Sequence, residues 1–223
     1  MTGVYITRLS AWAPGIGTGE WGEWASGKRG IASEVKGPEI TYTDSVFRRR
    51  LSQISKMTVH VIHGLLPLKD DTKIFFLSFR GELCREYQIF RMLIEDGELS
   101  PAAFSLSGFN TPVALATIAF GLKGGYTALY PEKNSFTAGV QAAEAALLSG
   151  TADELALVYA DENIPPECGR FFRESPVPIA FSLLLSRNPG QPSVPLSSLK
   201  GETDNPLAFL KQLLLRGELH VSS

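Results

Sequence analysis

Residues 121–148 read GLKGGYTALYPEKNSFTAGVQAAEAALL and contain a short apolar strand, an abrupt turn and an alanine-rich helix. We predict the strand over Tyr126–Tyr130, because aromatic and small apolar residues follow a pair of glycines there. The helix is predicted over Thr137–Ser149, with Thr137 as its N-cap. A buried strand followed directly by a helix is a building unit of α/β proteins.

The turn between this strand and this helix decides what chemistry the unit can perform. In many α/β enzymes such a corner presents the nucleophile at the N-terminus of the helix. Here the corner is Pro131–Ser135 and carries Lys133 and Ser135. A lysine could act as a nucleophile only as a desolvated neutral amine. The sequence alone leaves open whether Lys133 acts in this way or carries no chemistry.

The rest of the chain alternates between the same two kinds of element. Further strands are predicted over 3–12, Lys73–Phe79, Leu155–Tyr159 and Ile179–Leu185. Helices are predicted over 45–65, Glu82–Asp96, Pro112–Phe120 and 205–217. Ser100-Pro101 is expected to open a loop, and 187–203 to form an exposed connection. This alternation predicts an α/β layered fold with a single domain over 1–223.

Composition narrows the classes of partner. The chain has 223 residues, 20% charged side chains and a net charge of −2, so we expect no nucleic-acid binding. The longest apolar stretch, Val113–Leu122, is about half the length that spans a bilayer. Met1–Ile6 lacks the pattern of a secretory signal, and Cys84 and Cys168 form no C-x-x-C pair. We therefore predict a cytoplasmic protein without a membrane span.

Several stretches resemble sites but lack the remaining parts of one. Gly17–Gly22 matches G-x-G-x-x-G, yet the helix after it is too short for a dinucleotide-binding unit. His60 and His63 are three residues apart on one predicted helix, without further ligands at a telling spacing. No G-x-S-x-G elbow is present. The sequence therefore predicts no metal, no cofactor and no complete catalytic set.

Residues 100–162 resemble the central part of the β-ketoacyl synthases. That family shows a Ser-Pro start, an Asn before a small-residue helix, a Gly-Leu-[Lys/Arg]-Gly-Pro segment, and Gly-Asp-Ala-Asp after an alanine-rich helix. The matching residues are Ser100-Pro101, Asn110, Gly121-Leu122-Lys123-Gly124 and Gly150-Thr151-Ala152-Asp153. The opening stretch of the chain, GKRGI at 27–31 and RLSQISKM at 50–57 fit the family as well.

This resemblance implies that the nucleophile of the family has been lost. Counted from Gly121 forward or from Gly150 back, the position of the nucleophilic cysteine falls on Lys133, and Ser135 is its neighbour. The catalytic histidines and lysine of the family belong to a second half of the duplicated fold. A chain of 223 residues is about the size of one half. The implied fold is therefore a truncated, single-half thiolase-like layered α/β fold.

The resemblance is closest to stand-alone, N-terminal-half ketosynthase-like proteins, which are named as chain length factors in aryl polyene-type pathways. It implies a non-catalytic subunit that pairs with a full-length β-ketoacyl synthase and meets the acyl carrier protein only indirectly. Two alternatives stay open: an independent module that binds acyl groups or acyl carrier protein, and an enzyme that uses Lys133 or Ser135.

The resemblance also indicates where the partner would bind. Ketosynthases pair through the strand that leads into the nucleophile corner, which corresponds here to Tyr126, Thr127, Ala128, Leu129 and Tyr130, with Lys133 beside it. We expect Thr127→Pro to break this pairing by removing a backbone donor. The segment 102–109 would reach the acyl tunnel of the partner. Its bulky members Phe104, Leu106 and Phe109 either limit the chain length or belong to the core.

Overall fold

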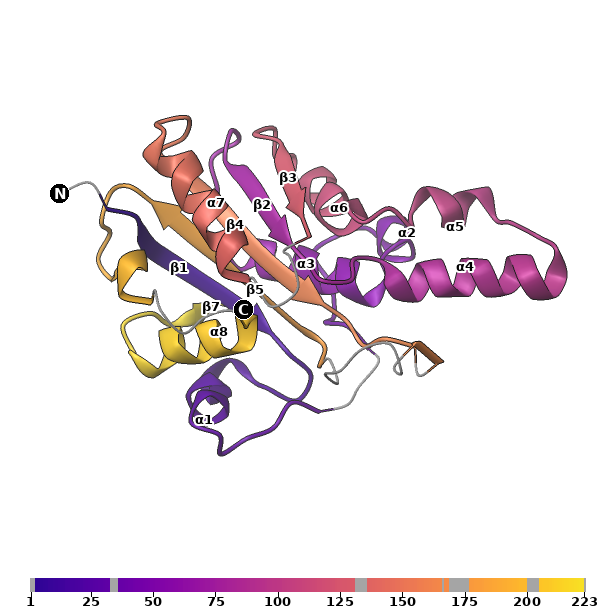
Figure 1. Cartoon of the computed structure of the whole chain (residues 1–223), viewed down its shortest axis with the longest axis horizontal. Helices are drawn as coiled ribbons and strands as arrows, with labels where there is room; N and C mark the ends of the chain where they lie inside the picture. The colour runs from indigo at the N-terminus through magenta and orange to yellow at the C-terminus, as the bar shows by residue number, and fades with distance from the viewer. Residues whose placement is uncertain are drawn as a thin grey trace.

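The computed structural model describes residues 3–32, 36–130, 136–165, 167–168, 177–199 and 205–222. Its strands form one mixed sheet in the order β3-β2-β4-β5-β1-β6, with β7 also paired to β1 (Figure 1). The strands are β1 (Tyr5–Trp12), β2 (Lys73–Leu77), β3 (Tyr126–Leu129), β4 (Glu154–Asp161), β5 (Ile179–Ser186), β6 (Val194–Pro195) and β7 (Val221–Ser222). β2 is parallel to β3 and β4, whereas β5 is antiparallel to β4 and β1. The sheet is therefore mixed, as an α/β layered fold with an antiparallel strand requires.

Helices cover both faces of this sheet (Figure 1). One face carries α1 (Trp21–Ala25), α7 (Phe136–Leu148) and α8 (Pro206–Leu215), and the other carries α3 (Gln53–His63) and α6 (Thr111–Phe120). Side chains of β2 alternate between the two layers: Phe75 and Leu77 pack in the first core, Ile74 and Phe76 in the second. Apolar residues on both faces are what a strand in the interior of a sheet needs. The predicted α/β layered fold is confirmed.

The helix α7 lies directly on the sheet. A Cβ added at Gly139 would come within 2.3 Å of the Leu77 Cδ2 atom, so only glycine fits between helix and strand there. The opposite side of α7 is open: Ala138, Ala142 and Ala145 are exposed. The helix is thus packed on one side and presents a stripe of small residues on the other.

A helical arm projects from the body. It consists of α4 (Leu83–Asp96), which ends at Gly97 in the left-handed conformation, and α5 (Pro101–Ser105). In Figure 1 the arm extends away from the sheet on the side where β3 lies. Ile89 is the residue of α4 that is buried, so most of this helix faces solvent.

Two predicted boundaries were wrong because capping residues were overlooked. The predicted helix over 45–65 is two helices, α2 (Ser45–Arg48) and α3. Asp44 caps α2 by accepting hydrogen bonds from the Val46 and Phe47 amides, and Ser52 caps α3 by accepting from the Ser55 amide. Ser100-Pro101 opens α5 rather than a loop, because the Ser100 hydroxyl accepts from the Ala103 amide at 3.3 Å. Serine followed by proline is a helix-start signal.

Two further predictions need correction. Thr137 lies inside α7 and is not its N-cap, since the helix already includes Phe136. Residues 187–203 are not simply an exposed connection: β6 pairs with β1, the 3-10 helix η3 (Leu196–Leu199) follows, and Val194, Leu196 and Leu199 are buried. The predicted helix over 205–217 is confirmed as α8. Its cap Asn205 accepts from the Leu207 amide at 2.8 Å.

Candidate functional site

The strand β3 forms one edge of the sheet and pairs with β2. The Ile74 amide donates to the Gly125 carbonyl at 3.1 Å, and the Ser78 amide donates to the Leu129 carbonyl at 3.3 Å. Backbone groups of successive residues in a strand point to opposite sides. Residues 125, 127 and 129 therefore face β2. The amide and carbonyl groups of Tyr126, Ala128 and Tyr130 point outward from the sheet.

This register corrects the expectation about Thr127. Its amide faces β2, so a proline there removes a hydrogen bond inside the chain rather than one to a partner. Ala128 is the residue whose amide faces outward, and its side chain is half-buried against the core on the α6 face. Proline at position 128 is therefore the substitution that tests pairing at this edge.

Apolar side chains surround the open edge. Tyr126 is 37% exposed and Tyr130 63%, and Ile118 on the neighbouring helix α6 is 69% exposed. The start of β3 is anchored, because the Asn110 Nδ2 group donates to the Tyr126 hydroxyl at 2.7 Å. The predicted interface strand is thus fixed on its β2 side, and no described residue pairs with its other side. Such an edge is a template for pairing with another chain.

The turn that carries Lys133 and Ser135 lies outside the described residues. Its flanks are packed in aromatic rings. Phe136, the first residue of α7, is fully buried, with its ring centre 5.7 Å from that of Tyr159 and 5.5 Å from that of Phe209. On the other flank the Tyr130 ring lies 6.4 Å from the Phe79 ring. Contacts of this kind stabilise both ends of the corner.

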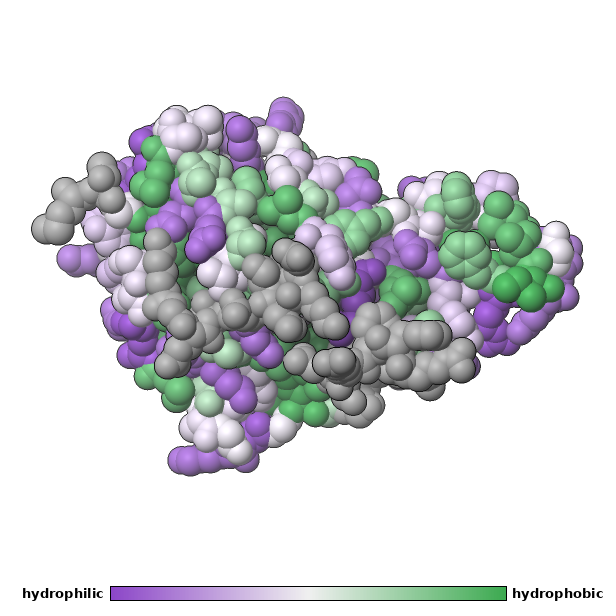
Figure 2. All heavy atoms as spheres, in the orientation of Figure 1, coloured by the Kyte–Doolittle hydropathy of each residue, from purple (hydrophilic) through white to green (hydrophobic). Residues whose placement is uncertain are grey.

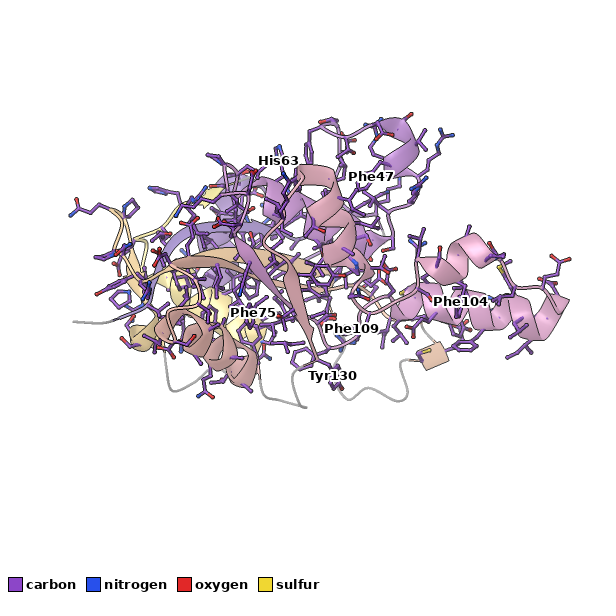
Figure 3. The ribbon with its side chains drawn as sticks, turned by 90° about the horizontal axis from the view of Figure 1, so that it is seen from above. Phe47, His63, Phe75, Phe104, Phe109 and Tyr130 are labelled. Carbon is purple, nitrogen blue, oxygen red and sulfur yellow. The ribbon has the colours of Figure 1, made fainter. Side chains whose placement is uncertain are left out.

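The three predicted tunnel residues occupy different surroundings, and Figure 3 shows two of them, Phe104 and Phe109. Phe109 lies next to Tyr130, with ring centres 6.5 Å apart, and also contacts the buried Phe76 at 6.2 Å. Leu106 packs partly against the core on the α6 face. Phe104 is 61% exposed on α5, out on the arm. The core alternative fits Leu106 and Phe109 better than it fits Phe104.

A buried carboxylate joins the ends of β2 and β4. Asp161 is 1% exposed and accepts hydrogen bonds from the Ser78 hydroxyl at 2.7 Å, the Tyr159 hydroxyl at 2.6 Å and the Arg80 amide at 3.1 Å. Burial raises the pKa of Asp161, although the Arg80 charge and these hydrogen bonds oppose the rise. This network fixes the chain as it leaves both strands.

Two further buried carboxylates, Glu82 and Glu162, lie at the N-terminus of α3. Glu82 accepts hydrogen bonds from the Ser52 and Ser55 hydroxyls, both at 2.7 Å, and forms an ion pair with Arg85. Glu162 accepts from the Ile54 amide at 3.0 Å. Burial, and then the charge of Glu82, raises the pKa of Glu162 to about 7. The pair joins α3, α4 and β4 into one packed junction.

Sequence reasoning missed these carboxylates. A usable signal was present, because the polar residues Ser78, Asp161 and Glu162 lie at the carboxyl ends of the apolar strands β2 and β4. The carboxyl ends of such strands meet at one edge, where polar side chains come together. Hydrogen bonding within the chain engages most of their oxygens, which is typical of a structural role.

The surroundings of His60, His63 and the two cysteines do not indicate a metal site or a reactive thiol. His60 is half-buried on α3, and burial lowers its pKa to about 4. His63 stacks on Tyr42 with ring centres 3.7 Å apart. Cys84 and Cys168 are free thiols, and burial raises the pKa of Cys84. Across the part of the chain that the structure describes, no group of three or more His, Cys, Asp or Glu side chains could hold a metal ion.

None of the helices in the described ranges is both long enough and apolar enough to cross a membrane.

The residues that match the ketosynthase pattern have structural roles, at turns, at close backbone contacts and in an ion pair. Gly121 ends α6 in the left-handed conformation. A Cβ at Gly124 would come within 2.3 Å of the Asp71 carbonyl oxygen, so this position needs glycine. Gly150 also has a positive φ of 78°. Asp153 forms an ion pair with Arg187 beside the junction of β4 and β5.

Comparisons with known proteins agree with this geometry. No curated protein matches the chain significantly. Among solved structures, the chain is similar to a chain of the complex of the ketosynthase ApeO with its chain length factor ApeC from Xenorhabdus doucetiae. That match has 27% identity and a TM-score of 0.77, and it covers 96% of this chain and 92% of that chain.

Two less similar structures share the fold. A chain of the ishigamide ketosynthase/chain length factor matches with 12% identity and a TM-score of 0.66, over 97% of this chain and 82% of that chain. A chain of AntDE:AntF, a type II PKS acyl-carrier protein in complex with its ketosynthase bound to the hexaketide, matches with 14% identity and a TM-score of 0.58. That match covers 83% of this chain and 64% of the other.

The layered α/β architecture is therefore the thiolase-like fold of the ketosynthases. The model of the β-ketoacyl synthase N-terminal domain matches residues 21–215. The chain belongs to the β-ketoacyl synthase N-terminal domain family.

Proposed function

We propose that this chain is a non-catalytic, chain-length-factor-like subunit that pairs with a full-length β-ketoacyl synthase. The reaction it serves is chain elongation of the polyketide (aryl polyene-like) or fatty-acid type. The observation that carries this proposal is the open edge of β3, where Tyr126, Ala128 and Tyr130 present unpaired backbone groups among exposed apolar side chains. The similarity to a chain of a ketosynthase–chain length factor complex supports the same conclusion.

The residue at the corner supports a role without catalysis. Nucleophilic attack on an acyl thioester needs a thiolate at this helix N-terminus, where backbone amides and the helix dipole favour an anion. The family resemblance assigns this position to Lys133, a positive charge that offers no thiolate. Beside the proposed interface at β3, the same charge could pair with an acidic group of the partner or disfavour homodimers.

Co-expression with the full-length β-ketoacyl synthases of the same organism tests the proposal. We expect one of them to co-purify with the chain as a stable one-to-one complex on size exclusion with light scattering. The isolated chain should show no decarboxylation of malonyl thioesters, and neither should its Lys133→Cys variant. A soluble, well-folded monomer that binds none of these ketosynthases would contradict the proposal.

A second candidate, an independent module that binds acyl carrier protein, is favoured by one observation. A groove of about 880 Å³ is lined by four basic side chains and one acidic side chain: Lys36, Arg48, Arg49, Lys56 and Glu39. Among the described residues, none of the four cations forms a side-chain ion pair. A phosphodiester-bearing carrier would find a complementary field there. Salt-sensitive binding of carrier protein to the isolated chain, lost in Arg49→Glu, would favour this candidate.

A further inference from the structure

The arm presents apolar side chains to solvent. The relevant residues, which we call the arm patch, are Phe90 (60% exposed), Met92 (40%), Leu93 (44%), Ile94 (81%) and Leu99 (45%). Phe90, Leu93 and Ile94 follow helical spacing on one side of α4, next to the buried Ile89. Figure 2 shows apolar side chains gathered towards the far end of the arm. Together they expose on the order of several hundred Å² of apolar surface, a size that marks interaction sites.

The charges of the arm favour a protein over a membrane as the occupant. Arg91 forms an ion pair with Glu95 at 3.1 Å, and Arg85 with Glu82 at 3.1 Å. The remaining charged residues of 83–98, which are Glu86, Asp96 and Glu98, are acidic. Membrane-surface helices instead carry lysine and arginine beside their apolar face, because the lipid surface is anionic. The arm patch thus lacks the charge that a lipid surface selects.

The base of the arm that carries this patch adjoins the open edge of the sheet. From α5 the chain returns to the body through Phe109, whose ring contacts the exposed Tyr130 at the end of β3. Gly81, just before α4, is also covered by Phe109: a Cβ there would lie 2.6 Å from its ring. The base of the arm is therefore held against the end of β3. A protein bound along β3 would extend towards the arm (Figure 1).

Strand pairing alone is too small to hold a stable complex. β3 has four residues and spans roughly 14 Å, whereas stable interfaces bury about 1,200–2,000 Å² in total. We propose that the arm patch is a second part of the ketosynthase interface, which grips the partner that pairs with β3. This inference rests on the proposed function, and it assigns the exposed apolar face of α4 to the same partner.

The test compares three variants of the full chain against the ketosynthase that co-purifies with the wild type. Phe90→Ser and Ile94→Lys alter the arm patch, and Leu215→Lys alters a comparably exposed leucine on α8, 61% exposed and away from the arm. Biolayer interferometry should show a Kd raised at least roughly tenfold for each arm variant. The control should bind as the wild type does. Circular dichroism verifies that each variant is folded, as we expect because substitutions at exposed positions change stability little.

A second measurement does not depend on substitutions. Oxidative footprinting of Met92 should fall severalfold when the ketosynthase is added, because a covered thioether is shielded from oxidant. An unchanged Kd in both arm variants, or unchanged oxidation of Met92 in the complex, would overturn the inference while the complex itself stands. Loss of self-association without loss of ketosynthase binding would assign the arm patch to a second copy of this chain. If the wild type binds no ketosynthase, the proposed function fails instead.

Discussion

The two edges of the sheet are built differently. At the β1 edge, two very short strands cover the backbone: β6 pairs with Tyr5 and Ile6, and β7 pairs with Leu9 and Ser10. β6 includes Pro195, a residue that blocks further pairing. At the β3 edge, Tyr126, Ala128 and Tyr130 direct their backbone groups outward.

The difference is that short strands and a proline cover the backbone at the β1 edge, whereas the β3 edge has no such cover among the described residues. Short edge strands and edge prolines are the devices by which natural sheets avoid unwanted pairing. Apolar residues instead surround the β3 edge, including Ile118 and Tyr130. An edge that is left open in this way is suited to a partner.

The largest effect is expected at the open edge. Ala128→Pro removes an outward amide and places a ring where a partner strand would approach, so the complex with the ketosynthase should be lost on size exclusion. Thr127→Pro is the matched comparison, because its amide is bonded within the chain. That variant should lower the free energy of unfolding of the isolated chain. If both variants lost the complex and lowered the free energy of unfolding equally, the alternation of inward and outward backbone groups along β3 would be contradicted.

The aromatic core behind the closed part of the sheet should determine stability. Phe209 on α8 is 1% exposed and packs on Phe136 and Phe181. Phe209→Ala should lower the free energy of unfolding by roughly 3–5 kcal/mol, because it leaves a cavity among these rings. Urea denaturation of the isolated chain measures the change. A loss below about 1 kcal/mol would mean that α8 is not an essential part of the core.

A pH effect is expected at the junction of α3, α4 and β4. Burial raises the pKa of Glu162 from 4.5 to about 7 in the folded chain, so ionisation is unfavourable there. Stability is therefore highest below pH 4.5 for this group and falls as the pH rises through 7. Over that window the wild type should lose up to about 3 kcal/mol relative to Glu162→Gln. Denaturation at pH 5 and pH 8 measures the difference, and parallel curves for the two proteins would contradict it.

The smallest effect on stability is expected on the arm. Phe104→Ala should change the free energy of unfolding by less than about 0.5 kcal/mol, since the side chain is largely exposed. Phe109→Ala should destabilise more, but less than the roughly 3–5 kcal/mol of a fully buried phenylalanine. If these residues close the acyl tunnel, the complex should make longer products with either variant. Unchanged product lengths, measured by mass spectrometry, would favour the core role.

Sequence patterns predicted the layers of the fold because the apolar periods are strong. The buried strands β2, β4 and β5 and the well-capped helix α8 lie where expected. Caps were the weak point: Asp44, Ser52 and Ser100 each start a helix, and a periodic pattern runs across such residues without interruption. β6 could not be predicted, since two residues carry no period and their pairing depends on distant β1.

The sequence predicted the strand of the candidate interface, but it did not predict the register in which this strand pairs with β2. Residues 126–130 were identified through the family resemblance, yet which backbone groups face outward depends on the partner strand β2. The side-chain pattern does not reveal this, so it does not distinguish Thr127, whose amide faces β2, from Ala128, whose amide faces outward. Glu162 shows the same limit, because its pKa is raised by burial in the folded chain and by the charge of Glu82, 80 positions earlier in the chain.

The open edge at β3 also bears on how much of this protein a cell can use. An edge accepts one strand at a time, so a second copy of the chain and a ketosynthase would compete for the same backbone groups. Self-pairing grows with the square of the free concentration, whereas pairing with a limited partner saturates. Production in excess of the ketosynthase would therefore leave surplus chains whose open edges can meet only one another, so a charge that disfavours pairs of like chains, as proposed for Lys133, would keep this surplus available for the ketosynthase.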